Sequence, residues 1–133
     1  MSAVFVDTVG LIVIWDEDDQ WHTAARTAFE RLFLNGTNLL STSFVMAEAG
    51  NAAARRNYRG AVEQLRTDFE STNRLIYPSH EDWQQAWDCY RRREGNSAGL
   101  VDCLSFVVMR RVGIQQAFTN DEHFVAAGFE VLF

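Results

Sequence analysis

The chain has 133 residues, of which 47% are hydrophobic, and this is enough for one domain (1–133) with a buried core. Its two cysteines, Cys89 and Cys103, form no CxxC pair, which excludes a disulfide framework and argues against structural zinc. The formal net charge of -6 disfavours non-specific nucleic-acid binding, because that binding depends on Lys and Arg. The sequence shows no basic leader and no apolar stretch of membrane-spanning length, so we expect a cytoplasmic protein with no membrane partner.

The first half of the chain alternates short apolar runs with segments of helical spacing. Residues 3–6 are β-branched or aromatic and end at Asp7, which predicts a buried strand. Residues 21–34 repeat apolar side chains at helical spacing, and Ser43 is the predicted N-cap of an alanine-rich helix. In chain order, this half is predicted to contain strand 3–6, helix 9–15, helix 21–34, strand 38–41, helix 43–56 and helix 60–69.

The second half continues the alternation. Ser79 and Asp82 have the spacing of a cap that opens a helix running to Arg93, and Gly113 predicts the end of an apolar helix. Segment 94–99 has the composition of a loop. In chain order, this half is predicted to contain strand 75–77, the helix that ends at Arg93, helix 101–112, strand 115–119, helix 121–126 and strand 130–133.

Short strands that are each followed by a helix are typical of a parallel sheet, because parallel neighbours need a crossover connection. Such sheets carry helices on both faces. The sequence therefore predicts an α/β protein with a three-layer α/β/α sandwich and a mainly parallel sheet.

Four acidic residues stand out within this pattern. Asp7 closes the first predicted strand and Asp121 follows the strand that ends at Thr119, so both belong at the carboxyl edge of the sheet, where functional groups collect. Asp102 lies in the first turn of an apolar helix, and Glu48 lies mid-helix among alanines. Each position has a structural explanation, such as a cap for Asp121, but four converging carboxylates would repel one another and favour a cation.

Oxygen ligands suit Mg²⁺ or Mn²⁺, and magnesium takes only one or two carboxylates directly. We expect Asp7 and Asp102 to be direct ligands, and Glu48 and Asp121 to bind a second ion or hold a water. Phosphodiester hydrolysis is the chemistry that such a site favours. Supporting hydrogen bonds are expected from three polar side chains close to these acids: Thr8, Thr119 and Asn51.

Four segments of the sequence resemble PIN-domain ribonucleases, and most closely the VapC-type toxins of toxin–antitoxin pairs. They are residues 4–8 (VFVDT), 41–48 (STSFVMAE), 101–106 (VDCLSF) and 117–124 (AFTNDEHF), and the ending 124–132 is also similar to that group. The resemblance implies a PIN-like α/β/α fold and Mg²⁺- or Mn²⁺-dependent cleavage of RNA by an acidic tetrad: Asp7, Glu48, Asp102 and Asp121. It further implies a homodimer and inhibition by a cognate antitoxin. One departure is Gly99, where many relatives carry Ser or Thr.

Two alternatives remain open from the sequence. A phosphatase or phosphotransfer domain would use Asp7 as nucleophile, but the chain has no lysine to balance a phosphate. A catalytically idle PIN-like module would only bind a partner protein.

Two arginine clusters, 55–59 and 91–93, are candidate RNA-binding patches or solvated helix ends. Trp83 and Trp87 have the i, i+4 spacing of core or dimer packing.

Overall fold

The computed structural model describes residues 3–133 and contains one sheet of five strands in the order β3-β2-β1-β4-β5. All four strand pairings are parallel. The strands are β1 (Ala3–Val6), β2 (Asn38–Thr42), β3 (Leu75–Ile76), β4 (Gln116–Phe118) and β5 (Glu130–Val131).

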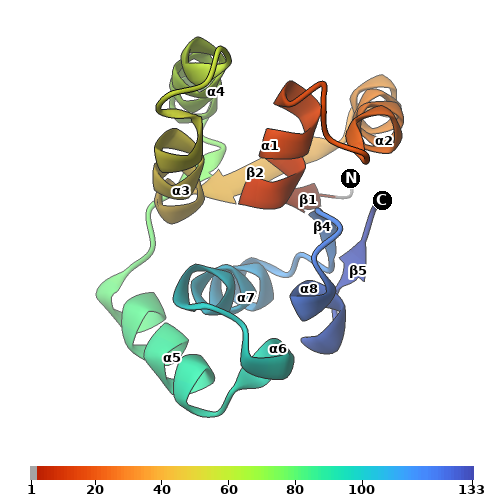
Figure 1. The fold of residues 1–133 in the computed structure, drawn as a ribbon. Helices are drawn as coiled ribbons and strands as arrows, with labels where there is room; N and C mark the ends of the chain where they lie inside the picture. The colour runs from red at the N-terminus through yellow and green to blue at the C-terminus, as the bar shows by residue number, and fades with distance from the viewer. Residues whose placement is uncertain (1–2) are drawn as a thin grey trace.

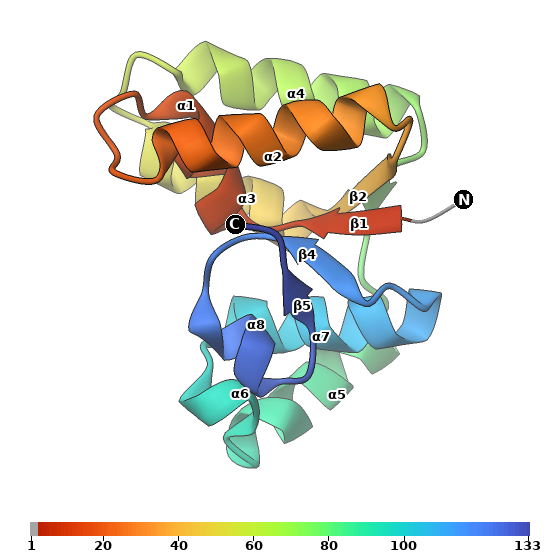
Figure 2. The ribbon, with the colours of Figure 1, turned by 90° about the vertical axis from the view of Figure 1, so that its right-hand side faces the viewer.

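Helices cover both faces of this sheet, as Figures 1 and 2 show. One face of the sheet is covered by the four helices of the N-terminal half: α1 (Thr8–Trp15), α2 (His22–Leu34), α3 (Ser43–Ala53) and α4 (Arg59–Ser71). The other face carries α5 (His80–Arg91), α6 (Glu94–Ser97), α7 (Leu100–Val112) and α8 (Glu122–Ala126). The predicted three-layer α/β/α fold is therefore confirmed. Within residues 3–133, none of these helices combines the length and hydropathy needed to cross a bilayer.

The core lies on both sides of β1, which is why this strand has no polar residue. Val4 and Phe5 are fully buried, and Phe118 on β4 and Phe106 on α7 are fully buried as well. Burying one such side chain contributes about 1.5–3 kcal/mol. This packing fixes the position of the two central strands.

The register of the two central strands brings the residues after them together. Val6 of β1 pairs with Phe118 of β4, so Asp7 and Thr119 leave the sheet side by side. Gly10 lets α1 approach β4 closely, because a Cβ at this position would collide with the carbonyl oxygen of Phe118 and lie 2.5 Å from its Cδ2. Asp7, which precedes α1, is therefore held close to the end of β4.

The helix that carries Glu48 differs from its prediction at both ends. Its N-cap is Thr42, not Ser43, because the Thr42 hydroxyl accepts the N–H of Val45 over 3.1 Å. The helix ends at Ala53 rather than at residue 56, since the chain turns there toward the start of α4. Ser79 and Asp82 form the predicted cap, with both reciprocal hydrogen bonds present.

The loop predicted for segment 94–99 is wrong in part, because the segment contains the short turn α6. The turn includes left-handed residues: Arg93, Gly95, Asn96 and Ser97 have φ between 57° and 62°. Such a conformation costs a non-glycine residue about 1–2 kcal/mol. Only glycine fits at position 95. A Cβ added there would lie 2.8 Å from both the carbonyl oxygen of His123 and Cε2 of Phe106.

Candidate active site

Asp7 is the most deeply placed of the four acids. It follows β1 directly and is 1% exposed. The hydroxyl of Thr119 donates a hydrogen bond to its Oδ2 over 2.9 Å. One carboxylate is thus held at the end of the central strand, with little contact to solvent.

Asp121 is positioned by the same threonine and by its own helix. The backbone N–H of Asp121 donates to the Thr119 hydroxyl over 3.1 Å. The Oδ1 of Asp121 accepts the N–H of His123 over 2.9 Å, so this acid caps α8. Since one oxygen serves the cap, the carboxylate has a second oxygen for another partner. The Nδ1 of His123 lies 2.7 Å from the carbonyl oxygen of Gly95.

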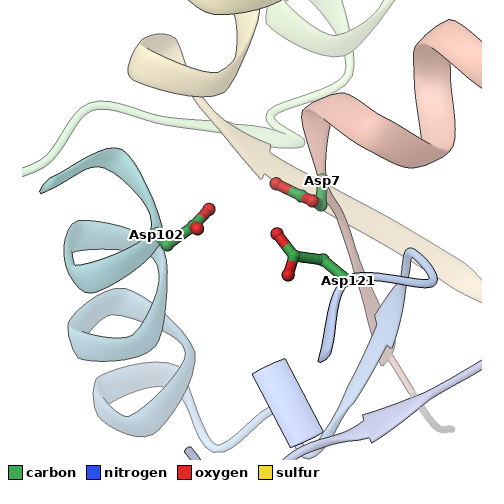
Figure 3. A group of neighbouring side chains, drawn as sticks. All are labelled: Asp7, Asp102 and Asp121. Atoms are coloured by element: carbon green, nitrogen blue, oxygen red, sulfur yellow. The ribbon is translucent and has the colours of Figure 1, made fainter. Parts of the chain in front are cut away.

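Asp102 faces these two residues from α7, which lies in the same helical layer as α8. It lies in the first turn of α7, whose N-cap is Gly99 and has no side chain to cap the helix. Figure 3 shows the three carboxylates, from the residue after β1, from α7 and from the start of α8, directed toward one another. One ligand atom from each of Asp7, Asp102 and Asp121 lies within 4.8 Å of the others.

Glu48 lines the same cleft but stands outside this group of three. Its Oε1 accepts a hydrogen bond of 2.8 Å from the hydroxyl of Thr8. The cleft measures about 390 Å³ and also includes Asn51, one helical turn beyond Glu48. The structure thus brings all four predicted acids to one cleft, with Thr8, Thr119 and Asn51 beside them.

The crowding of negative charge changes the acidity of two of these groups. Burial raises the pKa of Asp7 to about 7, and the charge of Asp102 adds to the rise while the hydrogen bond from Thr119 opposes it. Burial also raises the pKa of Asp102 to about 6, with further contributions from the charges of Asp121 and Glu48. Both carboxylates are therefore destabilised as free anions, and a positive charge among them would stabilise the ionised forms.

The donor set fits a divalent cation of the hard type. The three clustered residues offer carboxylate oxygens, and the cleft adds the Thr8 hydroxyl and the Asn51 amide; oxygen ligands of this kind are those that Mg²⁺ and Mn²⁺ prefer. Within residues 3–133, no Lys or Arg nitrogen lies within 4.0 Å of Asp7, Asp102 or Asp121, and the charge of His123 only partly opposes the rise in the pKa of Asp102. The cluster can therefore hold a metal ion.

Comparison with known proteins agrees with this geometry. The family model of the PIN domain matches residues 4–130. This chain belongs to the PIN domain family. The 23S rRNA-specific endonuclease VapC20 of Mycobacterium tuberculosis, from two strains, is 31% identical over 128 residues, which cover 95% of each chain. The crystal structure of Mycobacterium tuberculosis VapC20, a sarcin–ricin loop-cleaving toxin, superposes with a TM-score of 0.80 at 29% identity over 96% of each chain.

The predicted class, a PIN-domain ribonuclease of the VapC toxin type, is confirmed by these matches. The nuclease is thereby favoured over the phosphatase and the idle binding module. One supporting residue was not predicted. The buried hydroxyl of Ser41 donates to the carbonyl of Val6 over 2.8 Å and ties the end of β2 to the residue before Asp7. The two adjacent polar residues Ser41 and Thr42 at the carboxyl end of a buried strand are the signal that points to it.

Proposed function

We propose that this PIN-domain protein is the toxin of a toxin–antitoxin pair and hydrolyses RNA with Mg²⁺ or Mn²⁺ at the carboxylate cluster. The observation that carries the proposal is the convergence of Asp7, Asp102 and Asp121 within 4.8 Å at the carboxyl edge of the sheet. A divalent cation supplies charge stabilisation at the phosphate and activates water for attack.

The four acids have different roles in this proposal. Asp7 and Asp102 are direct ligands, because their carboxylates are the two whose pKa values are raised and which gain most from a positive charge. Asp121 and Glu48 hold a second ion or a water, since each already has one oxygen engaged, by the His123 N–H and by the Thr8 hydroxyl. Asn51 offers a hydrogen bond to a substrate phosphate from the wall of the cleft.

We infer that the substrate is a structured loop of the large ribosomal RNA. The relative VapC20, similar over nearly the whole chain, is described as specific for 23S rRNA and as cleaving the sarcin–ricin loop. A substrate in the ribosome also places the activity in the cytoplasm. The proposed partners are a cognate antitoxin that covers the acidic site and a second copy of this chain in a homodimer.

The test is cleavage of purified ribosomes and of an RNA hairpin that carries the sarcin–ricin loop, with Mg²⁺, Mn²⁺ or EDTA. We expect metal-dependent cuts that vanish in Asp7→Asn and Asp102→Asn. Cleavage that persists in EDTA would contradict the metal assignment. A hairpin with a scrambled loop is the control for substrate choice, and equal cutting of both hairpins would contradict the ribosomal target.

The matched control for the carboxylate variants is Asp18→Asn, an exposed loop residue that is expected to leave cleavage unchanged. Light scattering of the purified chain tests the homodimer. Co-purification with the product of an adjacent small reading frame, followed by loss of cleavage, tests the antitoxin.

A further inference from the structure

A groove beside the start of α7 contains aromatic and basic side chains that the active site does not use. Its volume is about 490 Å³. We call it the α5–α7 groove, and its lining residues are Trp87, Tyr90, Arg91, Arg93, Ser97 and Ala98. Figure 1 shows α5 and the turn α6 below α7, where this segment of the chain turns back toward the sheet.

The aromatic side chains of the groove are both exposed and firmly held. Trp87 is 40% exposed and Tyr90 is 48% exposed. Their rings meet edge to face with centroids 5.4 Å apart, and Trp87 packs in the same way on Trp83 at 5.8 Å. Rings that are fixed at their inner edge and open to solvent provide a platform on which nucleic-acid bases stack, whatever their sequence.

The charge of the groove favours an anionic ligand. Arg91 pairs with Asp88 over 3.0 Å, whereas no carboxylate in the described part of the chain lies within 4.0 Å of the guanidinium of Arg93. No acidic side chain lines the groove. In a chain of net charge -6 without lysine, this combination of arginines and open rings fits phosphates that carry bases.

The backbone of the groove is held in an unfavourable conformation. Arg93 and Ser97, which both line it, have φ of 57° and 61°. Buried Gly95 lies between them and packs against Phe106 and the backbone of His123. Non-glycine residues in the left-handed region persist where the surroundings enforce them, and such positions concentrate at functional sites. The packing thus fixes the point from which Arg93 projects.

The groove and the carboxylate cluster are connected by the few residues at the start of α7. Ala98 lines the groove and precedes Gly99, the N-cap of α7, and Asp102 follows in the first turn. From Gly99 to Asp102 the helix rises about 5 Å. A strand of RNA whose phosphate lies at Asp102 therefore has a neighbouring nucleotide within reach of the groove.

We propose that the α5–α7 groove binds an unpaired nucleotide of the RNA substrate next to the cleaved bond, with the base on Trp87 and Tyr90 and a phosphate on Arg93. This inference rests on the proposed function, since it assigns a subsite for the same RNA. A second copy of the chain is a poorer occupant, because a two-fold contact centred here would place Arg91 and Arg93 of both copies in one interface to which the groove lining adds no carboxylate.

The test measures RNA binding in the Asp102→Asn background, which removes cleavage as a complication. The probe is a fluorescein-labelled single-stranded RNA of mixed sequence, and the readout is fluorescence anisotropy. We expect Trp87→Leu to weaken binding about 10-fold through lost stacking. We expect Arg93→Ala to weaken binding and to reduce the slope of log K against log salt by about 1.

Matched control variants are available on the opposite face of the sheet. Trp21 is 45% exposed beside α2, and Arg31 is an exposed arginine of α2. Trp21→Leu and Arg31→Ala are expected to bind RNA as the Asp102→Asn parent does. Trp87→Leu keeps an apolar contact with Trp83, so its thermal midpoint is expected to stay near that of the parent.

Two results would overturn the inference. One is unchanged RNA affinity and salt slope in Trp87→Leu and Arg93→Ala. The other is a loss of dimer mass in Trp87→Leu with RNA affinity unchanged, which would assign the groove to a protein contact. Failure of the proposed function is seen separately, as absence of RNA cleavage by the wild-type chain.

Discussion

The hydroxyl of Thr119 donates a 2.9 Å hydrogen bond to Oδ2 of Asp7, joining two residues that lie 112 positions apart. The same hydroxyl accepts the backbone N–H of Asp121 over 3.1 Å. One fully buried side chain therefore sets the position of the first and the fourth acid.

Thr119→Val tests this dual role. Valine has nearly the same shape but cannot donate to Asp7 or accept from Asp121, so we expect metal affinity to fall roughly 10-fold, as for other lost partners of metal ligands. The measurement is the Mg²⁺ or Mn²⁺ concentration at half-maximal cleavage. Thr119→Ser keeps the hydroxyl and is expected to stay close to wild type; equal metal affinity in the valine variant would contradict the role.

The pH dependence of the metal-free protein is set by the raised pKa values of Asp7 and Asp102. In the unfolded chain Asp7 titrates near 3.8, and in the folded protein burial raises its pKa to about 7. The native state therefore holds more protons than the unfolded state between these values, and its free energy of unfolding falls as pH rises from 3.8 to about 7. Chemical denaturation in EDTA at several pH values measures the effect, and added Mg²⁺ is expected to reduce it.

Asp7→Asn removes the larger part of this pH dependence of the free energy of unfolding. Because asparagine carries no charge, we expect the metal-free variant to be more stable than the wild type at pH 7, by about 1–3 kcal/mol. The variant is expected to lose the stabilisation by Mg²⁺ as well as cleavage. A variant less stable than the wild type in EDTA at pH 7 would show that hydrogen bonding at Asp7, not its charge, dominates.

The sequence predicts the carboxylate cluster well because its members occupy positions that local patterns define. Asp7 follows an apolar strand, Asp121 follows another, and Asp102 opens an apolar helix. Local patterns could not show that Glu48 stands apart from the group formed by the other three acids. Thr8 engages Glu48 by a hydrogen bond between residues 40 positions apart, and such tertiary contacts have no local signal.

The two wrong predictions, the N-cap at Ser43 and the loop at 94–99, also arise because local sequence patterns do not show tertiary packing. Thr42 and Ser43 are both good capping residues, and only the backbone conformation of Thr42, with ψ at 160°, decides between them. The turn α6 depends on left-handed residues that include Arg93 and Ser97. Neither residue type favours that conformation, so packing of Gly95 against Phe106 and His123 imposes it.

The link between α5 and α7 provides a further prediction. Arg111 donates two hydrogen bonds to Asp82, from Nε to Oδ1 over 2.9 Å and from Nη2 to Oδ2 over 2.8 Å. Burial acts to raise the pKa of Asp82, but the hydrogen bonds from Arg111 and Ser79 outweigh it and hold the pKa below its usual value. The stability from this pair is therefore present at neutral pH and is lost as pH falls below the ordinary value of 3.8.

Arg111→Met leaves the buried carboxylate without its main partner. Because half of the Arg111 side chain is exposed, we discount the full cost of a broken buried pair and expect a loss of about 1–2 kcal/mol at pH 7. Arg66→Met, which removes exposed pairs to Glu63 and Glu70 within α4, is the control and is expected to cost clearly less than Arg111→Met, because solvent screens exposed pairs. The free energy of unfolding of both variants is measured by urea denaturation. Equal losses in Arg111→Met and Arg66→Met would contradict the special role of Asp82.

Gly10→Ala tests the close approach that holds Asp7 against β4. The added Cβ would collide with the carbonyl oxygen of Phe118 and lie 2.5 Å from its Cδ2, and backbone cannot yield as a flexible side chain does. We expect α1 to shift away from β4, with a loss of about 1–3 kcal/mol and reduced cleavage, since Asp7 adjoins α1. The matched control is Gly50→Ala in α3, where no atom of residues 3–133 beyond the local helix backbone and the two chain neighbours lies within 4 Å of the new Cβ and where alanine is expected to stabilise by about 1 kcal/mol. Wild-type stability and cleavage in Gly10→Ala would show that the end of β4 does not determine the placement of Asp7.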